Sequence, residues 1–303
     1  MASTYSRADR RHFDALGDEV GKLYGEGSYA DALARIDAEA DGLLPWRSDL
    51  AHLAACLHAT SGDPRAALAT LRAALTEGAW WDVRILTDDD GLVAVRELPG
   101  YAELAEESGR RCEAAHREEA PIPPVVLRPG TAPRGVLVAL HGADQEAEDT
   151  AETWTAGTAA GFVVVAVTSS RRSTPTYRTW PDQAAAAADV RLALETLSDG
   201  ERELPMVAGG FSAGGRAALL WALTADPRPV ASVLLVAPAI DPDRLPAQRA
   251  LIRGTVIVGA DDDLADDVRA TVEALSPAEL TLDLVDGLDH AYPPDFADRL
   301  LRF

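Results

Sequence analysis

The feature that most constrains this chain is a short apolar run that reaches a glycine-serine-glycine turn and continues as an alanine- and leucine-rich stretch. The apolar run covers residues 205–209, and Ser212 follows with Gly210 and Gly214 two positions away on either side. On a sharp strand-to-helix turn, a Cβ at either glycine would collide with the reversing backbone. The helix N-terminus beyond the turn offers N–H groups and a dipole that favour a developing oxyanion. The stretch therefore predicts a nucleophilic Ser212.

The composition is that of a globular protein and argues against two classes of partner. The chain is 47% hydrophobic and 25% charged, and no apolar run approaches the roughly 20 residues that span a bilayer. The net charge of −21 would repel the phosphates of nucleic acids and of anionic membranes, so we expect neither as a partner. Residues 1–11 are polar and lack the apolar core of a secretory signal, and we expect a cytoplasmic location.

Metal and cofactor motifs are missing from the sequence. It contains no H-E-x-x-H motif, no cysteine pair with zinc spacing and no nucleotide-binding glycine loop after a strand, so we expect no metal and no cofactor. Residues 88–90 are three aspartates without the spaced ligands of a calcium loop, and we interpret them as an exposed turn.

Cys56 and Cys112 are interpreted as buried thiols, with a disulfide as the alternative. Four histidines are interpreted as surface or packing residues: His12, His52, His58 and His116.

The first third of the chain, residues 7–117, reads as successive helices. The pattern at residues 27–34 is echoed at residues 62–69, an offset close to the period of about 34 residues of tetratricopeptide repeats. The region resembles two degenerate hairpins of that type followed by further helices. We favour a cap that shapes the entrance to a catalytic domain, since two repeats are fewer than a free-standing solenoid needs. A groove for a protein partner, or a homodimer contact, is the alternative.

A proline-rich connector at residues 121–124 separates this helical domain, residues 1–120, from a second domain, residues 121–303. In the second domain, apolar runs alternate with helical stretches, which predicts an α/β fold: a mostly parallel sheet covered by helices on both faces. Ligands of such sheets bind beyond the carboxyl ends of the strands. The expected strands cover residues 135–140, 162–167, 205–209, 230–236, 255–258 and 280–285.

Groups with catalytic chemistry follow four of these runs. His141-Gly142-Ala143 comes after the first, Ser212 after the third, three aspartates at 261–263 after the fifth, and His290 after the last. A serine needs a base within hydrogen-bond reach, and the base needs a carboxylate that orients it. We expect His290 to be the base, and His141 to hold its own loop in place.

These strand ends give the second domain a clear resemblance. Residues from about 124 to 303 resemble an α/β-hydrolase, close to the dienelactone hydrolases and to small carboxylesterases and thioesterases. The resemblance implies a Ser212–His290–Asp262 triad, and a loop shifted by one residue would select Asp261 or Asp263 instead. It also implies oxyanion donors at the backbone N–H groups of Ala213 and Ala143. The motifs are Leu140-His141-Gly142, Gly210-Phe211-Ser212-Ala213-Gly214-Gly215, Gly259-x-x-Asp262 and Gly287-Leu288-Asp289-His290-Ala291-Tyr292-Pro293.

The expected reaction is hydrolysis of an ester or thioester of a small organic substrate through an acyl-enzyme. The alternatives are an acyl-transfer or cyclising variant, and a partner-binding protein with an inert hydrolase domain. Residues 236–255 leave no room for a large lid, so the loops 168–181 and 237–247 and the N-terminal helices are expected to shape the pocket. The expected substrate contacts are Asp144 and Gln145, together with Tyr177 and Trp180, for which packing of their own loop is the alternative.

Overall fold

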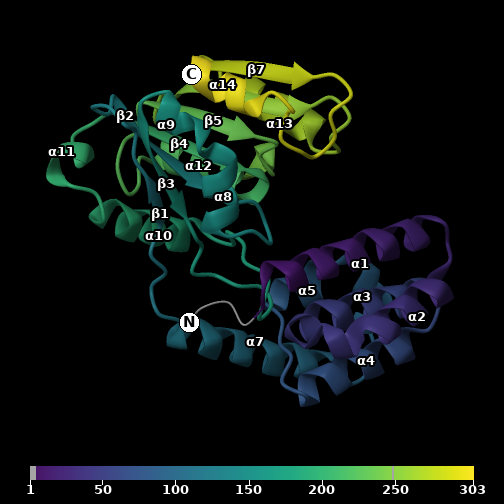
Figure 1. Ribbon diagram of the computed structural model, residues 1–303. Coiled ribbons are helices and arrows are strands. Elements are labelled where there is room, and N and C mark those ends of the chain that lie inside the picture. Colours follow the sequence, from purple (N-terminus) through teal and green to yellow (C-terminus); the bar gives the residue numbers. More distant parts are fainter. Residues whose placement is uncertain (1–4, 248) are drawn as a thin grey trace. The chain divides into compact units, whose positions relative to one another are not determined.

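The protein is described by a computed structural model covering residues 5–247 and 249–303, and its contacts divide the chain into two units. Unit 1 comprises Met1–Ala120 and the short segment Arg172–Tyr177, and unit 2 comprises Pro121–Arg171 and Arg178–Phe303. Unit 1 is helical and unit 2 carries the sheet (Figure 1). The predicted α/β class with a preceding helical region is confirmed.

Unit 1 begins with two helical hairpins, α1 (Arg7–Gly25) with α2 (Tyr29–Glu39) and α3 (Arg47–Thr60) with α4 (Pro64–Thr76). Each hairpin turns at a left-handed glycine, Gly27 with φ 73° and Gly62 with φ 93°. These glycines open the two echoed sequence patterns, so the repeat signal marks the two turns. The other elements are the 3-10 turns η1 (Ala40–Gly42), η2 (Leu44–Trp46) and η3 (Asp90–Leu92), with α5 (Val83–Asp88), α6 (Val93–Arg96) and α7 (Tyr101–Glu118).

Two buried tryptophans lie in the separate apolar clusters of unit 1. Trp46 packs in the cluster of α1, α2 and α3, and Trp81 in the cluster of α3, α4 and α7. The Trp81 indole N–H donates to the backbone oxygen of Ser48 at 2.9 Å, and its backbone N–H donates to the Ser108 hydroxyl at 2.6 Å. The polar end of this large side chain is therefore satisfied inside the core, as burial requires.

The segment Arg172–Tyr177 belongs to unit 1 through polar contacts. The hydroxyls of Thr174 and Thr176 donate to the two carboxylate oxygens of Asp49 on α3, at 2.8 and 2.6 Å. The Ser173 backbone oxygen accepts from the Asp82 N–H at 2.7 Å. Burial raises the pKa of Asp49, and the two threonine hydrogen bonds oppose that rise.

The sheet of unit 2 has seven strands in the order β1-β3-β2-β4-β5-β6-β7, and only β1 runs antiparallel to its neighbour. Strands β2, β3 and β4 are buried along their whole length, as their continuous apolar sequences predict. The strand β1 was not predicted. The strands are β1 (Val125–Leu127), β2 (Gly135–Leu140), β3 (Phe162–Val167), β4 (Met206–Phe211), β5 (Ser232–Val236), β6 (Arg253–Gly259) and β7 (Glu279–Val285).

Helices alternate with the strands of the sheet, as expected. Two helices lie between β2 and β3, α8 (Ala147–Trp154) and α9 (Ala156–Ala159), and the short α11 (Asp199–Arg202) precedes β4. The others are α10 (Gln183–Glu195), α12 (Ser212–Thr224), α13 (Ala265–Ala274) and α14 (Phe296–Arg302), with a 3-10 turn η4 (Pro242–Arg244).

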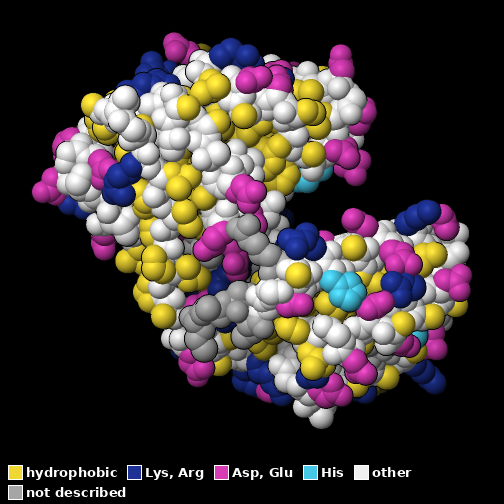
Figure 2. All heavy atoms as spheres, viewed as in Figure 1, with side chains coloured by type: hydrophobic (Ala, Val, Ile, Leu, Met, Phe, Trp, Pro, Cys, Tyr) yellow, Lys and Arg dark blue, Asp and Glu magenta, His cyan; other side chains and the backbone are white. Residues whose placement is uncertain are grey.

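Acidic side chains are spread over the visible face of both units and form no single patch there (Figure 2). Among the described residues, no helix combines the length and apolarity needed to cross a bilayer. Cys56 and Cys112, both described, carry thiols and form no disulfide; Cys112 is buried and Cys56 is half-buried.

The two hairpin turns generate a prediction about backbone conformation. A Cβ added at Gly62 would meet no atom within 4 Å, so Gly62→Ala should destabilise the protein through its left-handed φ alone, by about 1 kcal/mol. Gly109 lies inside α7, where an added Cβ would come no closer than 4.0 Å to another side chain. Gly109→Ala should therefore stabilise the protein by roughly 0.5–1 kcal/mol. Urea unfolding of the full chain measures both, and equal effects would contradict the argument.

Candidate active site

Ser212 lies on the turn between β4 and α12, with φ 50° in the left-handed region. Such a conformation is strained for any residue with a Cβ, and strain of this kind concentrates at functional sites. A Cβ at Gly210 would lie 2.5 Å from the Gly214 carbonyl, and one at Gly214 would lie 2.3 Å from the carbonyl oxygens of Leu140 and His141. The predicted need for glycine at both positions is confirmed.

His290 lies between Ser212 and Asp262 and contacts each through a different ring nitrogen. Nε2 lies 2.9 Å from the Ser212 hydroxyl oxygen, and Nδ1 lies 2.9 Å from Oδ2 of Asp262. The Asp262 side chain is 1% exposed, whereas that of His290 is 40% exposed. Oδ1 of Asp262 accepts from the backbone N–H of Leu264 at 2.9 Å, so both carboxylate oxygens have donors.

The neighbouring aspartates do not share this position. Asp261 and Asp263 are exposed, and the backbone N–H of Asp261 donates to the Leu288 oxygen at 3.0 Å. A Cβ at Gly259 would lie 2.0 Å from that same Leu288 oxygen, so only glycine lets the end of β6 approach the loop that carries His290. This close approach brings the buried carboxylate to the histidine ring.

The N–H groups beside Ser212 suit an oxyanion. Ala213 is in the first turn of α12, where a backbone N–H has no acceptor within the helix. In the loop after β2, the Gly142 N–H donates to Oε1 of Gln145 at 2.9 Å, and the Asp144 N–H donates to the Arg178 oxygen at 2.7 Å. Ala143 lies between Gly142 and Asp144, and among the described residues its N–H has no protein acceptor.

The other predicted substrate contacts have structural partners. Asp144 has φ 60° and, like Gln145, is half-buried within the loop after β2. Trp180 is buried, and its indole N–H donates to the His141 backbone oxygen at 2.8 Å. Tyr177 lies in the Arg172–Tyr177 segment of unit 1, half-buried.

His141 is the first residue after β2 and is completely buried. The Ser169 N–H donates to Nε2 at 3.0 Å, so Nδ1 carries the proton and donates to the Gly142 oxygen at 2.6 Å. Burial lowers the pKa of His141 to about 4, because the charged ring would lose its hydration. The neutral ring therefore joins the loop after β2 to the loop after β3. Sequence reasoning missed Ser169 and Arg178, which hold these loops through backbone atoms that leave no motif.

The burial of His141 predicts a loss of stability on acidification. Its folded pKa lies below the unfolded value of about 6.5, so the stabilisation is present above that pH and is lost as the pH falls towards 4. This one group should remove about 2 kcal/mol from the free energy of unfolding between pH 7 and pH 5. Urea titrations at both pH values, compared with His141→Asn, isolate this loss. An NMR titration of the His141 ring is a second measurement, and a ring pKa near 6.5 would contradict the prediction.

The comparisons with known proteins bear on both units. Residues 131–257 match a family model described as serine aminopeptidase, S33, and residues 13–116 match one described as A/B hydrolase-like, N-terminal domain. No curated protein sequence matches the chain.

Several solved structures resemble the chain. An uncharacterized protein from Bacillus cereus is 21% identical, with a TM-score of 0.52 over 96% of this chain and 97% of its own. Esterase PE8 is 18% identical, with a TM-score of 0.48 over 61% of this chain and 98% of its own. Acyl-protein thioesterase 2 from Zea mays is 18% identical, with a TM-score of 0.45 over 59% and 96%.

The two family matches agree with the order of the elements. The first spans β2 to β6 with the serine turn between them, and the second spans the helices α1 to α7. The mostly parallel sheet is the one expected from the hydrolase motifs, with β1 as an additional, antiparallel strand at its edge. The chain has the α/β-hydrolase fold, and residues 13–116 match the family model described as A/B hydrolase-like, N-terminal domain.

Proposed function

We propose that the protein is a serine hydrolase that cleaves an ester or thioester of a small organic substrate through an acyl-enzyme. The observation that carries the proposal is the His290 ring, which joins the Ser212 hydroxyl to the buried carboxylate of Asp262. A serine is a weak nucleophile at neutral pH, and a histidine oriented by a carboxylate supplies the base it needs.

In the first half-reaction, Nε2 of His290 takes the Ser212 proton while Oγ bonds to the substrate carbonyl carbon. Asp262 accepts the Nδ1–H hydrogen bond and stabilises the imidazolium without taking its proton. The N–H groups of Ala213 and Ala143 donate to the oxyanion of the tetrahedral intermediate. The intermediate expels the alkoxide or thiolate, which receives the proton from Nε2. A water molecule then repeats these steps on the acyl-enzyme and releases the acid.

The choice of an ester or thioester rests on the sequence resemblance to small carboxylesterases and thioesterases. An aminopeptidase is the second candidate, because residues 131–257 match a family model described by that activity. A panel of p-nitrophenyl esters, acyl thioesters, lactones and aminoacyl p-nitroanilides separates the two. Turnover of the anilides alone would overturn the ester proposal in favour of the aminopeptidase.

The nucleophile assignment predicts the pattern of covalent labelling. A fluorophosphonate probe should label the wild-type protein, and Ser212→Ala should abolish labelling. Ser212→Ala and His290→Ala should each lower kcat by on the order of 10⁶. The serine and the histidine act as one catalytic unit, so removal of either side chain abolishes the contribution of both. Circular dichroism confirms that the variants are folded. Absence of labelling in the folded wild-type protein would instead support an inert hydrolase domain with partner-binding helices, and labelling that persists in Ser212→Ala would remove the assignment.

The assignment of Asp262 as the carboxylate that orients His290 predicts that three neighbouring substitutions affect kcat unequally. Asp262→Asn should lower kcat by roughly 10³–10⁴, because an amide cannot hold the His290 tautomer that accepts the serine proton. Asp261→Asn and Asp263→Asn are matched controls on exposed carboxylates and should leave kcat within about twofold. Steady-state kinetics on one p-nitrophenyl ester measure all three. Equal activity of the three variants would contradict the assignment of Asp262.

A further inference from the structure

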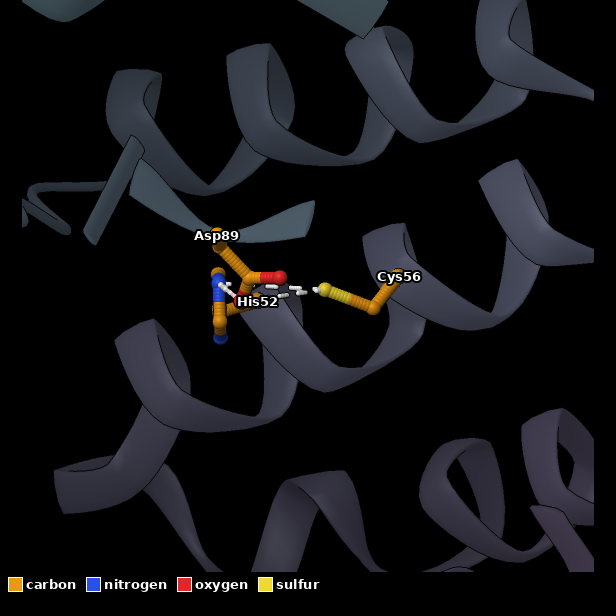
Figure 3. Close-up of side chains that lie close together, drawn as sticks. All are labelled: His52, Cys56 and Asp89. Atoms are coloured by element: carbon orange, nitrogen blue, oxygen red, sulfur yellow. Dashed lines mark hydrogen bonds and ion pairs between the residues drawn. The ribbon is translucent and has the colours of Figure 1, made fainter. Parts of the chain in front are cut away.

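Unit 1 contains a second group of chemistry-bearing side chains, which the proposed hydrolysis does not use. His52 and Cys56 lie one turn apart on α3, and Asp89 caps the N-terminus of the 3-10 turn η3 (Figure 3). Within the described residues, this is the one group of three His, Cys, Asp or Glu side chains whose ligand atoms all lie within 4.8 Å of one another. The three atoms are Nε2 of His52, Sγ of Cys56 and Oδ2 of Asp89.

These three atoms converge on one point. Nε2 of His52 lies 3.0 Å from Oδ2 of Asp89 and 3.8 Å from Sγ of Cys56, and Sγ lies 3.8 Å from the same Oδ2. A nucleophilic relay needs the two nitrogens of one ring on different partners, as at His290. At His52, thiol and carboxylate both face Nε2, so the arrangement is that of ligands around a shared centre.

The surrounding backbone holds the carboxylate and thiol in this arrangement. The Gly91 N–H donates to Oδ1 of Asp89 at 2.7 Å, which leaves Oδ2 directed at the other two groups. A Cβ at Gly91 would lie 3.1 Å from Sγ of Cys56, so glycine preserves the space of the thiol. The Asp89 backbone oxygen also accepts from the Arg96 guanidinium. Outer contacts of this kind orient ligands in metal sites.

A cavity of about 310 Å³ in unit 1 adjoins the three side chains. His52, Cys56 and Asp89 line it together with apolar groups that include Val20, Tyr24 and Leu53. A fourth ligand could therefore reach a bound ion from the cavity. Three protein ligands with an open fourth position are the pattern of catalytic rather than structural zinc sites.

We propose that His52, Cys56 and Asp89 bind a zinc ion through Nε2, Sγ and Oδ2, with the fourth position open to this cavity. Thiolate and imidazole favour zinc over the hard cations Ca²⁺ and Mg²⁺. Tetrahedral bonds of about 2.0–2.3 Å place ligand atoms roughly 3.3–3.6 Å apart, close to the separations found. Binding releases the Cys56 thiol proton and any proton on Nε2, and no electron is transferred.

The competing interpretation is an ion pair between His52 and Asp89 with the thiol beside it. Burial lowers the pKa of His52, but the hydrogen bonds with Asp89 and Cys56 outweigh it and raise the pKa to about 9. Asp89 is half-buried, which corrects its interpretation as part of an exposed turn, whereas Asp88 and Asp90 are exposed as expected. No motif marks the site, because Asp89 lies 33 residues beyond Cys56 in the sequence.

Cobalt spectroscopy on the 303-residue chain, stripped with a chelator, tests the site directly. Co²⁺ should give a thiolate-to-cobalt charge-transfer band that saturates at one equivalent and disappears when Zn²⁺ is added. Cys56→Ser should abolish the band, and Asp89→Asn should weaken cobalt binding by about tenfold or more. Circular dichroism establishes that the variants are folded.

The chain contains a matched control in Cys112. Cys112 likewise lies four residues from a histidine on one helix, here with the cysteine first, and its Sγ lies 3.8 Å from Nε2 of His116. That Nε2 contacts the backbone of Arg172, and no group of three ligand atoms among the described residues includes this pair. Cys112→Ser should therefore retain the band. A wild-type protein without the band, a band lost in Cys112→Ser but kept in Cys56→Ser, or equal loss in both variants would overturn the proposal.

Discussion

The contacts around Ser212 depend on backbone atoms that approach more closely than any Cβ would allow. Gly210, Gly214 and Gly259 each lie where an added Cβ would meet a carbonyl group at 2.5 Å or less. The left-handed φ of Ser212 costs on the order of 1–3 kcal/mol, which the completely buried strands β2, β3 and β4 can offset. The hydroxyl is thus held in place by the sheet core and not by its own hydrogen bonds alone.

Three histidines show how one side chain takes different forms in different surroundings. His141 is buried among backbone groups and stays neutral, because both nitrogens are already committed within its loops. His290 keeps 40% of its side chain exposed and has different partners on its two nitrogens, as proton transfer requires. His52 presents a single nitrogen to two acidic groups, an arrangement that suits a bound cation. The groups that contact its two ring nitrogens therefore determine which chemistry each histidine can perform.

Strands β2 and β3 have the bounds predicted from the sequence, because continuous runs of valine and leucine at a parallel sheet's centre carry a strong local signal. Ser212 follows the buried strand β4, whose sequence carries the same signal, whereas His290 follows the partly exposed edge strand β7 and was predicted with the help of the hydrolase motif. The three residues of β1 pair with a strand far along the chain, so their local sequence does not reveal them. The contacts of Asp49 with Thr174 and Thr176, and of Asp89 with His52, join distant segments through single polar atoms, which no periodicity records.

Because the segment Arg172–Tyr177 belongs to unit 1, no single cleavage of the chain separates the two units. Removal of the first 120 residues would take away Asp49, Asp82 and His116, the partners of this segment, while leaving the segment itself attached to the loop after β3. Buried threonine hydroxyls and a backbone carbonyl would then be exposed to water in a strand-to-helix connection that also carries Ser169 and Trp180. In an excised sheet domain, the loop after β3 would therefore lose the hydrogen-bond partners that it has in the whole chain. Circular permutants or chimaeras of this architecture need to keep both pieces of unit 1 together.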